Sequence, residues 1–340
     1  MKKRIRGILG QLHRQAPMRQ LIGATGRPLL LPFYHTVSDT RLPHIANLYA
    51  PRNTKQFIQD LEFLCRHFQP VTLDELYQVV AGQRPHTKPV FHLTFDDGLK
   101  EVYTVIAPIL EQKGIPATVF LNTGFLDNKA LFFRYKVSLI LESINTSANQ
   151  ALLTQIAACL GFNPRQKPDW HQRLLSLGYH DQQLIEQIAN ILQLDFDAYL
   201  QKEQPYLTSA QIKDLQQRDF TFGSHSIDHP LFSKIPLEEQ KRQVQQSLTE
   251  LDRLGISKNR YFSFPFSDDG VSLELIKWLH TEADCKLTFG ISGLKDDVSP
   301  YHLHRVPVEG TAKPMEQLIK SEYLYYLLKV PFRKNTVSRT

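Results

Sequence analysis

Two adjacent carboxylates follow an apolar run early in the chain. Asp96 and Asp97 come directly after residues 90–95, a run rich in Phe and Val that is typical of a buried strand, and Gly98 is a turn former that ends it. We therefore expect both acids at the C-terminal end of a strand, the edge at which α/β folds built on parallel strands bind ligands. Because neighbouring carboxylates repel each other, such a pair usually needs a cation or a shared proton.

Two histidines, His225 and His229, lie four residues apart later in the chain. Gly223 and Ser224 end a strand-like run before them, and Pro230 follows, so this pair also leaves a strand at its C-terminal end. A spacing of four lets both rings point the same way, as metal sites require. Together with the paired acids, the histidines predict a metal-dependent hydrolytic site. The alternative is a set of surface turn acids and solvated histidines.

Strand-like and helix-like segments alternate around both motifs, which is typical of parallel βαβ units. From about residue 125 to 217 the alternation stops, and a Gln- and Leu-rich composition with helical spacing predicts an all-helical insertion within one domain. The predicted strands are 29–35, 71–72, 90–95, 117–122, 220–222, 261–264, 287–289 and 305–308. The predicted helices outside the insertion are 54–68, 101–112, 237–254 and 273–280, together with one that ends at Val80 and that Thr72 or Asp74 could cap.

The net charge of +6 is modest, and much of it lies in the two tails. The chain also lacks the interleaved basic and aromatic residues of a nucleic-acid groove, so we expect no nucleic-acid partner. The three cysteines, Cys65, Cys159 and Cys285, are far apart and in no metal-binding spacing, which fits a reducing compartment.

The N-terminus is basic, but residues 7–15 are interrupted by polar side chains and lack the apolar core of a secretory signal. No segment has the roughly 18 apolar residues that a membrane span needs. We therefore expect a cytoplasmic protein. The basic N-terminal segment could form a weakly amphipathic helix that touches an anionic inner membrane face, although a solvated tail is the favoured interpretation.

Residues 94–98, Thr-Phe-Asp-Asp-Gly, together with residues 225–230, His-Ser-Ile-Asp-His-Pro, resemble the polysaccharide deacetylase family, the NodB-homology group of carbohydrate esterases (family 4). The resemblance covers roughly residues 28–125 and 215–310. It implies an α/β fold, a distorted (β/α) barrel that removes acetyl groups from acetylated sugars. The expected parts are a basic N-terminal segment (1–27), two barrel parts (28–124 and 218–312) around the helical insertion (125–217), and a C-terminal helix with a basic tail (313–340).

The resemblance makes Asp97, His225 and His229 the ligands of a divalent metal, most often zinc. It makes Asp96 the general base that takes a proton from the attacking water. A site with two histidines and one aspartate leaves room for water and substrate, and the cation lowers the pKa of the water and polarises the acetyl carbonyl.

The third family motif departs from its usual form, since residues 262–267 read Phe-Ser-Phe-Pro-Phe-Ser. Ser263 stands where many members have an arginine that orients the base, and Arg305 is a candidate replacement unless it is an ordinary structural arginine. The backbone N–H of Phe266, after Pro265, is expected to help bind the oxyanion.

Three histidines are candidates for the general acid, and the sequence does not decide between them. The family's usual acid lies in a Leu-x-His motif, which His304 and His302 match only incompletely. His35 follows the first predicted strand, and Tyr-His at this place often opens the subgroup. Each could instead be a hydrogen-bonded structural histidine.

These expectations define a metal-dependent hydrolase that cleaves a carbon–nitrogen bond, removing the acetyl group from an N-acetylated amino sugar in a glycan or glycan precursor. The alternative is a non-catalytic carbohydrate-binding or assembly protein on a degenerate deacetylase barrel.

Overall fold

The computed structural model describes residues 16–84, 88–146, 149–162, 169–256 and 259–339. The basic start of the predicted N-terminal segment, for which a membrane-contacting helix is the alternative to the favoured solvated tail, lies outside the described residues.

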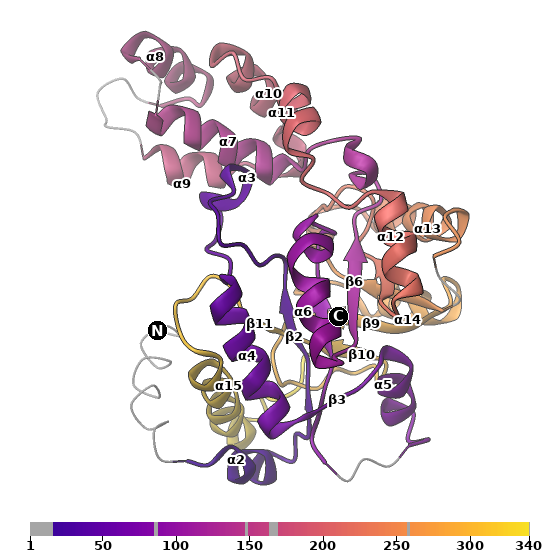
Figure 1. Cartoon of the computed structure of the whole chain (residues 1–340). Coiled ribbons are helices and arrows are strands. Elements are labelled where there is room, and N and C mark those ends of the chain that lie inside the picture. Colours follow the sequence, from indigo (N-terminus) through magenta and orange to yellow (C-terminus); the bar gives the residue numbers. More distant parts are fainter. Residues whose placement is uncertain (1–15, 85–87, 147–148, 163–168, 257–258, 340) are drawn as a thin grey trace.

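Eight parallel strands form the main sheet, in the order β10-β9-β8-β7-β6-β5-β2-β11. The strands are β2 (Pro32–Tyr34), β5 (Leu93–Phe95), β6 (Ala117–Leu121), β7 (Thr221–Ser224), β8 (Arg260–Ser263), β9 (Cys285–Gly290), β10 (His302–His304) and β11 (Val306–Pro307). The two outer strands, β10 and β11, are separated in the chain by Arg305 alone. The chain therefore links both edges of the sheet at one residue, and the sheet curls into a nearly closed barrel (Figure 1).

A short three-stranded sheet, β1-β4-β3, lies at the start of the barrel strands. Its members are β1 (Leu29–Leu30), β3 (Gln69–Pro70) and β4 (Val90–Phe91). The predicted strands 29–35 and 90–95 are thus each broken, at Leu31 and at His92. The His92 ring is buried and bonds the Val71 carbonyl and the Thr118 hydroxyl, both at 2.8 Å, so a polar side chain sits where the two sheets diverge.

Helices cover the outside of the barrel (Figure 1). They are α2 (Met18–Thr25), α4 (Thr54–His67), α5 (Leu73–Val80), a π-helical turn η1 (Val102–Ile106) that leads into α6 (Ala107–Lys113), η4 (Phe232–Lys234), α13 (Leu237–Arg253), α14 (Leu273–Thr281), α15 (Met315–Lys329) and η5 (Val330–Phe332). Asn53 and Thr72 begin α4 and α5 with reciprocal capping boxes, so Thr72 is the cap of the second helix. Within the described part of the chain, no helix is both long and apolar enough to cross a membrane.

The helical insertion gathers at one end of the barrel (Figure 1). It comprises η2 (Leu126–Asn128), α7 (Phe133–Thr146), α8 (Gln150–Cys159), α9 (Trp170–Leu175), η3 (Tyr179–Asp181), α10 (Gln182–Ile191) and α11 (Phe196–Glu203). Apart from η2, whose Leu126 belongs to the barrel core, these elements share their own apolar core, to which Ile45 of α3 (Pro43–Ala46) also belongs. The following helix, α12 (Ser209–Gln217), instead buries Ile212 and Leu215 in the barrel core. The part that packs as an insertion therefore ends before α12, earlier than the predicted residue 217.

Candidate active site

The predicted acids and histidines meet at the C-terminal ends of β5 and β7. Asp96 and Asp97 directly follow β5, His225 directly follows β7, and all of them are buried with His229. The Asp97 Oδ1 atom lies 3.3 Å from Nε2 of His229 and 3.8 Å from Nε2 of His225. One ligand-type atom from each of these three residues lies within 4.8 Å of the other two. The sequence spacing alone could not establish this convergence.

These three residues fit a divalent cation. Asp97 Oδ1 is buried without a hydrogen-bond partner, while Tyr135 donates its hydroxyl to the other carboxylate oxygen at 2.9 Å. The Ser263 carbonyl, 2.8 Å from Nδ1 of His225, can only accept, so Nδ1 carries the proton and Nε2 presents its lone pair toward Asp97. Burial lowers the pKa of both histidines and favours the neutral rings that bind metals.

Four residues at this site have a strained backbone. Asp97, Ser226, His229 and Phe266 all adopt positive φ, between 56° and 71°. Each such conformation costs about 1–3 kcal/mol in a residue other than glycine, and it persists where the surrounding structure holds it in place. The Ser226 hydroxyl accepts the backbone N–H of His229 at 3.1 Å, which helps to hold the loop in this conformation. Asp97 and His229, which face each other, are two of these four residues.

Arg305 forms a two-pronged ion pair with Asp96, at 2.7 and 2.8 Å. The guanidinium is fully buried, and it also donates to Thr94 Oγ1 at 2.9 Å and to Ser263 Oγ at 2.6 Å. Burial alone would raise the pKa of Asp96, but the charge of Arg305 holds that pKa below its usual value. Ser263 is small, and its hydroxyl accepts a hydrogen bond from Arg305, which lies between the two outer strands.

His35 directly follows β2 and is held by Glu309. The carboxylate lies 2.6 Å from Nδ1 of His35 and accepts the backbone N–H groups of His35 and Thr36 at 2.8 and 2.9 Å. Burial opposes protonation, but Glu309 raises the pKa of His35 to about 9. The ring therefore carries a proton at neutral pH, with Nδ1 on Glu309 and Nε2 left for other partners.

One cavity of about 320 Å³ joins these groups. Its lining is largely aromatic and aliphatic around the polar residues His35, Asp96, Asp97, Arg134, Tyr135, His225 and His229. Phe266 lies on its wall with 36% of its surface exposed, and none of the described residues accepts a hydrogen bond from the Phe266 N–H. Pro265 is buried beside it, and the Pro265 carbonyl accepts the Ser267 N–H at 2.6 Å, which fixes the turn.

A sequence profile of the polysaccharide deacetylase family matches residues 83–277, more than half of the chain. The protein belongs to the polysaccharide deacetylase family. Membership supports a carbohydrate deacetylase or esterase, a hydrolase whose substrates are acetylated carbohydrates, and the family is generally metal-dependent. No curated protein sequence matches the chain significantly.

Two solved structures share the fold of this deacetylase-family protein. The deacetylase PplD of Streptococcus pyogenes, solved in complex with acetate, is 17% identical with a TM-score of 0.54, covering 86% of this chain and 97% of that one. IcaB of Ammonifex degensii is 17% identical with a TM-score of 0.53, covering 87% and 97%. The predicted fold, a NodB-type (β/α) barrel, is thereby confirmed.

Sequence reasoning missed the part of the site that the insertion of this deacetylase-family chain supplies. Phe132 packs against His229, with ring centroids 4.6 Å apart, and Tyr135 bonds Asp97. Arg134 and Leu175, the last residue of α9, also line the cavity. No motif in the sequence marks these residues.

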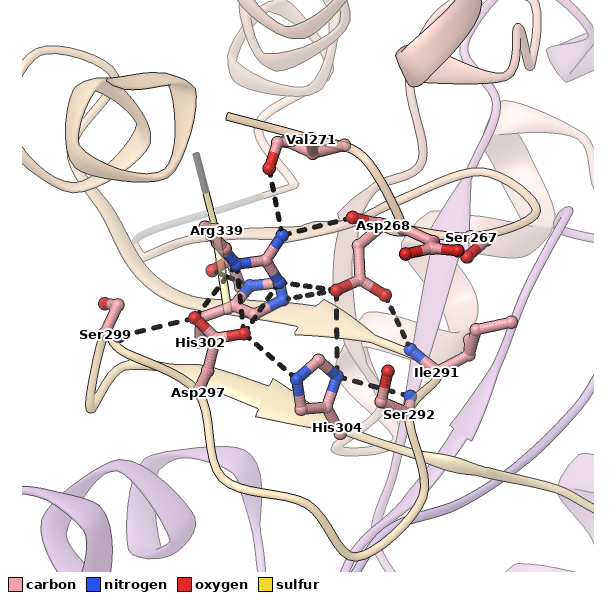
Figure 2. A network of polar contacts seen from close by, with 12 residues as sticks. Ser267, Asp268, Val271, Ile291, Ser292, Asp297, Ser299, His302, His304 and Arg339 are labelled. Atoms are coloured by element: carbon pink, nitrogen blue, oxygen red, sulfur yellow. Dashed lines mark hydrogen bonds and ion pairs between the residues drawn. The ribbon is translucent and has the colours of Figure 1, made fainter. Parts of the chain in front are cut away.

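The other two acid candidates, His302 and His304, lie in a separate buried cluster shown in Figure 2. His302 contacts Asp268 at 3.2 Å and His304 contacts Asp297 at 3.1 Å, and neither histidine lines the cavity. Burial lowers the pKa of His302 to about 4. The structure therefore brings His35, and not His304, together with Asp96, because the β10 side chains at 302 and 304 point toward Asp268 and away from the cavity.

This second cluster contains aspartates and histidines, the side-chain types that bind metals, but the positively charged side chain of Arg339 already contacts its carboxylates. The Arg339 guanidinium reaches Asp268 at 2.5 Å and Asp297 at 2.7 Å (Figure 2). Asp268 also accepts the N–H of Ile291, a cavity residue, at 3.1 Å. Arg339 thus ties the C-terminal tail to a loop of the active site.

Replacing Arg339 by alanine is expected to lower the free energy of unfolding by about 3–5 kcal/mol, because it leaves two buried carboxylates without their cation. Chemical denaturation measures this change. Arg333→Ala, an exposed arginine on the same tail, is the control and should stay within about 0.5 kcal/mol of the unchanged protein. Equal stability of both variants would contradict the role of Arg339.

Proposed function

We propose that this protein hydrolyses the acetamide of an N-acetylated amino sugar in a glycan or glycan precursor, with zinc as the metal. The observation that supports the proposal is how the acidic and histidine side chains are arranged in the cavity. Asp96, paired with Arg305, lies beside an Asp97 oxygen that lacks a partner and faces the Nε2 atoms of His225 and His229.

Asp97, His225 and His229 would hold the cation. A bound divalent cation supplies a water of lowered pKa and polarises the acetyl carbonyl. Asp96 accepts the proton of the attacking water, and it is ionised at neutral pH because Arg305 holds its pKa down. The two hydrogen bonds from Arg305 also fix the plane of the Asp96 carboxylate, so the carboxylate has one orientation toward the attacking water.

The Phe266 N–H is the donor for the oxyanion that forms when water adds to the acetyl carbon. It comes from a turn fixed by Pro265, and no described residue takes its hydrogen bond. A preorganised main-chain donor of this kind stabilises developing negative charge without reorganising during the reaction.

His35 donates a proton to the leaving amine as the carbon–nitrogen bond breaks. Glu309 keeps the ring protonated at neutral pH, and the ring lines the same cavity as Asp96. The water oxygen joins the acetyl carbon and one water proton goes to Asp96. The amine receives its proton from His35.

The test is acetate release from a panel of N-acetylated chito-oligosaccharides, sugar nucleotides and lipid-linked precursors, with O-acetylated sugars as the comparison. We expect release from at least one N-acetylated class and loss of release on metal removal. Glycan binding without acetate release from any substrate would instead support the non-catalytic alternative. The expected cytoplasmic location and contact with an anionic membrane face remain proposals, which cell fractionation tests.

Replacing Glu309 by glutamine is expected to shift the alkaline limb of the kcat/KM profile to lower pH. Glu309 raises the pKa of His35 from 6.5 to about 9, so the acid is protonated below that value and loses its proton as pH rises through it. Without the carboxylate charge the pKa falls toward 6.5, and activity is lost at lower pH. An unchanged alkaline limb would remove His35 as the acid.

A further inference from the structure

Arg134, at the start of insertion helix α7, brings a positive charge to the cavity wall. One guanidinium N–H donates to the carbonyl of Leu175. The same group lies over the rings of Phe133 and Phe266, at 5.5 and 5.6 Å from their centroids. These contacts hold the guanidinium in place but bring it no negative charge.

Arg134 forms no ion pair with any carboxylate in the described part of the chain. Other arginines that are withdrawn from solvent do have one, as Arg305 has Asp96 and Arg52 has Asp60 at 3.1 Å. Burial lowers the pKa of Arg134, and no acidic side chain opposes that effect. A half-buried guanidinium without a counter-charge is costly, and an anion that enters with a ligand removes that cost.

The acids of the cavity are already engaged. Arg305 takes both oxygens of Asp96, and Asp97 is bonded by Tyr135 and faces the two histidines. His35 is neutralised by Glu309. A cation held by Asp97 would add further positive charge. Among the charged residues that line the cavity, Arg134 is therefore the one that remains available to bind a negative group of the ligand.

We propose that Arg134 binds an anionic group, a phosphate or a carboxylate, carried by the acetylated sugar. The planar guanidinium presents paired N–H donors that match both oxyanions. Because the cavity is only about 320 Å³, the anion and the acetyl group belong to the same or adjoining sugar units. This inference rests on the proposed function for the acetyl group, and it narrows the substrate to acidic or phosphate-bearing amino sugars.

Calorimetric titration of the metal-loaded protein with three probes tests the proposal. N-acetylglucosamine 1-phosphate and N-acetylmuramic acid carry the two kinds of anion, and methyl N-acetylglucosaminide is the neutral comparison. We expect at least one anionic probe to bind ~10- to 100-fold more tightly than the neutral one, as charge-assisted hydrogen bonds do. The probe that binds more tightly identifies phosphate or carboxylate as the group.

Arg134→Gln should remove this preference and leave binding of the neutral probe within about twofold. Arg173→Gln is the matched control, because Arg173 is an exposed arginine of the same insertion that also bonds a helix-end carbonyl, that of Leu160. Arg134→Lys keeps the positive charge but loses the paired N–H donors of the guanidinium, so we expect an intermediate preference for the anionic probe. With an anionic substrate, Arg134→Gln should raise KM with little change in kcat.

Equal affinity of the unchanged protein for anionic and neutral probes would overturn the proposal, whether or not the variants fold. An anion preference that survives in Arg134→Gln would also overturn it, because the preference would then come from the cation of the site. If no substrate releases acetate but an Arg134-dependent preference is measured, the proposed function fails and the anion site is supported.

Discussion

Changing Asp96 to asparagine is expected to reduce kcat for acetate release by about 10²–10⁴-fold, the usual contribution of a positioned general base. Asparagine keeps the shape of the side chain but cannot accept the proton of the attacking water. Steady-state acetate release measures the effect. Metal content should stay at the level of the unchanged protein, because the proposed ligand oxygen belongs to Asp97 and not to Asp96.

Asp269→Asn is the matched control for this substitution. Asp269 is the exposed second member of another Asp-Asp pair, and it does not line the cavity. Its replacement should leave kcat unchanged. Turnover of Asp96→Asn at the rate of the unchanged protein would show that the base has been assigned to the wrong residue.

Changing Arg305 to methionine should lower both stability and activity. The substitution leaves the buried Asp96 charge uncompensated, which costs about 3–5 kcal/mol of unfolding free energy at neutral pH. Arg305 depresses the pKa of Asp96, so its stabilisation is present above the ordinary carboxylate pKa of 3.8 and is lost as pH falls through the depressed value. In the variant that pKa rises, and the acid limb of the activity profile moves to higher pH.

A second variant separates the ion pair from simple loss of packing. Arg305→Ser combined with Ser263→Arg places the guanidinium at the family's usual position, in space that Arg305 has vacated. We expect the double variant to regain a substantial part of the stability and activity that Arg305→Met loses, as measured by denaturation and acetate release. An Arg305→Met protein as stable as the unchanged one would exclude a structural role for the pair.

The metal-type residues could be predicted because their signals are local. Asp96 and Asp97 stand at the end of an apolar run, and His225 and His229 stand four residues apart after another, so strand ends on a parallel sheet placed them together. The parallel βαβ arrangement followed from the alternation of strands and helices, while the barrel was implied by the family resemblance. What a sequence pattern shows best is the periodicity of short segments and the residues that end them.

The rest of the site depends on contacts between residues far apart in the chain. Arg305 meets Asp96 only because the sheet closes, which joins a late strand to an early one. Tyr135 and Arg134 come from an insertion whose helical spacing says nothing about which residues face the barrel. The general acid stayed open for the same reason, since only the path of β10 turns His302 and His304 toward Asp268.

Stepwise addition of Zn²⁺ to metal-stripped protein, followed by the rate of acetate release, tests the central claim most directly. We predict that the rate rises until one equivalent per chain is bound and then stays constant, because Asp97, His225 and His229 form one site and Arg339 occupies the second cluster. Asp97→Asn should show no such rise. Acetate release that is undiminished in the stripped protein, and unaffected by added metal, would contradict the account.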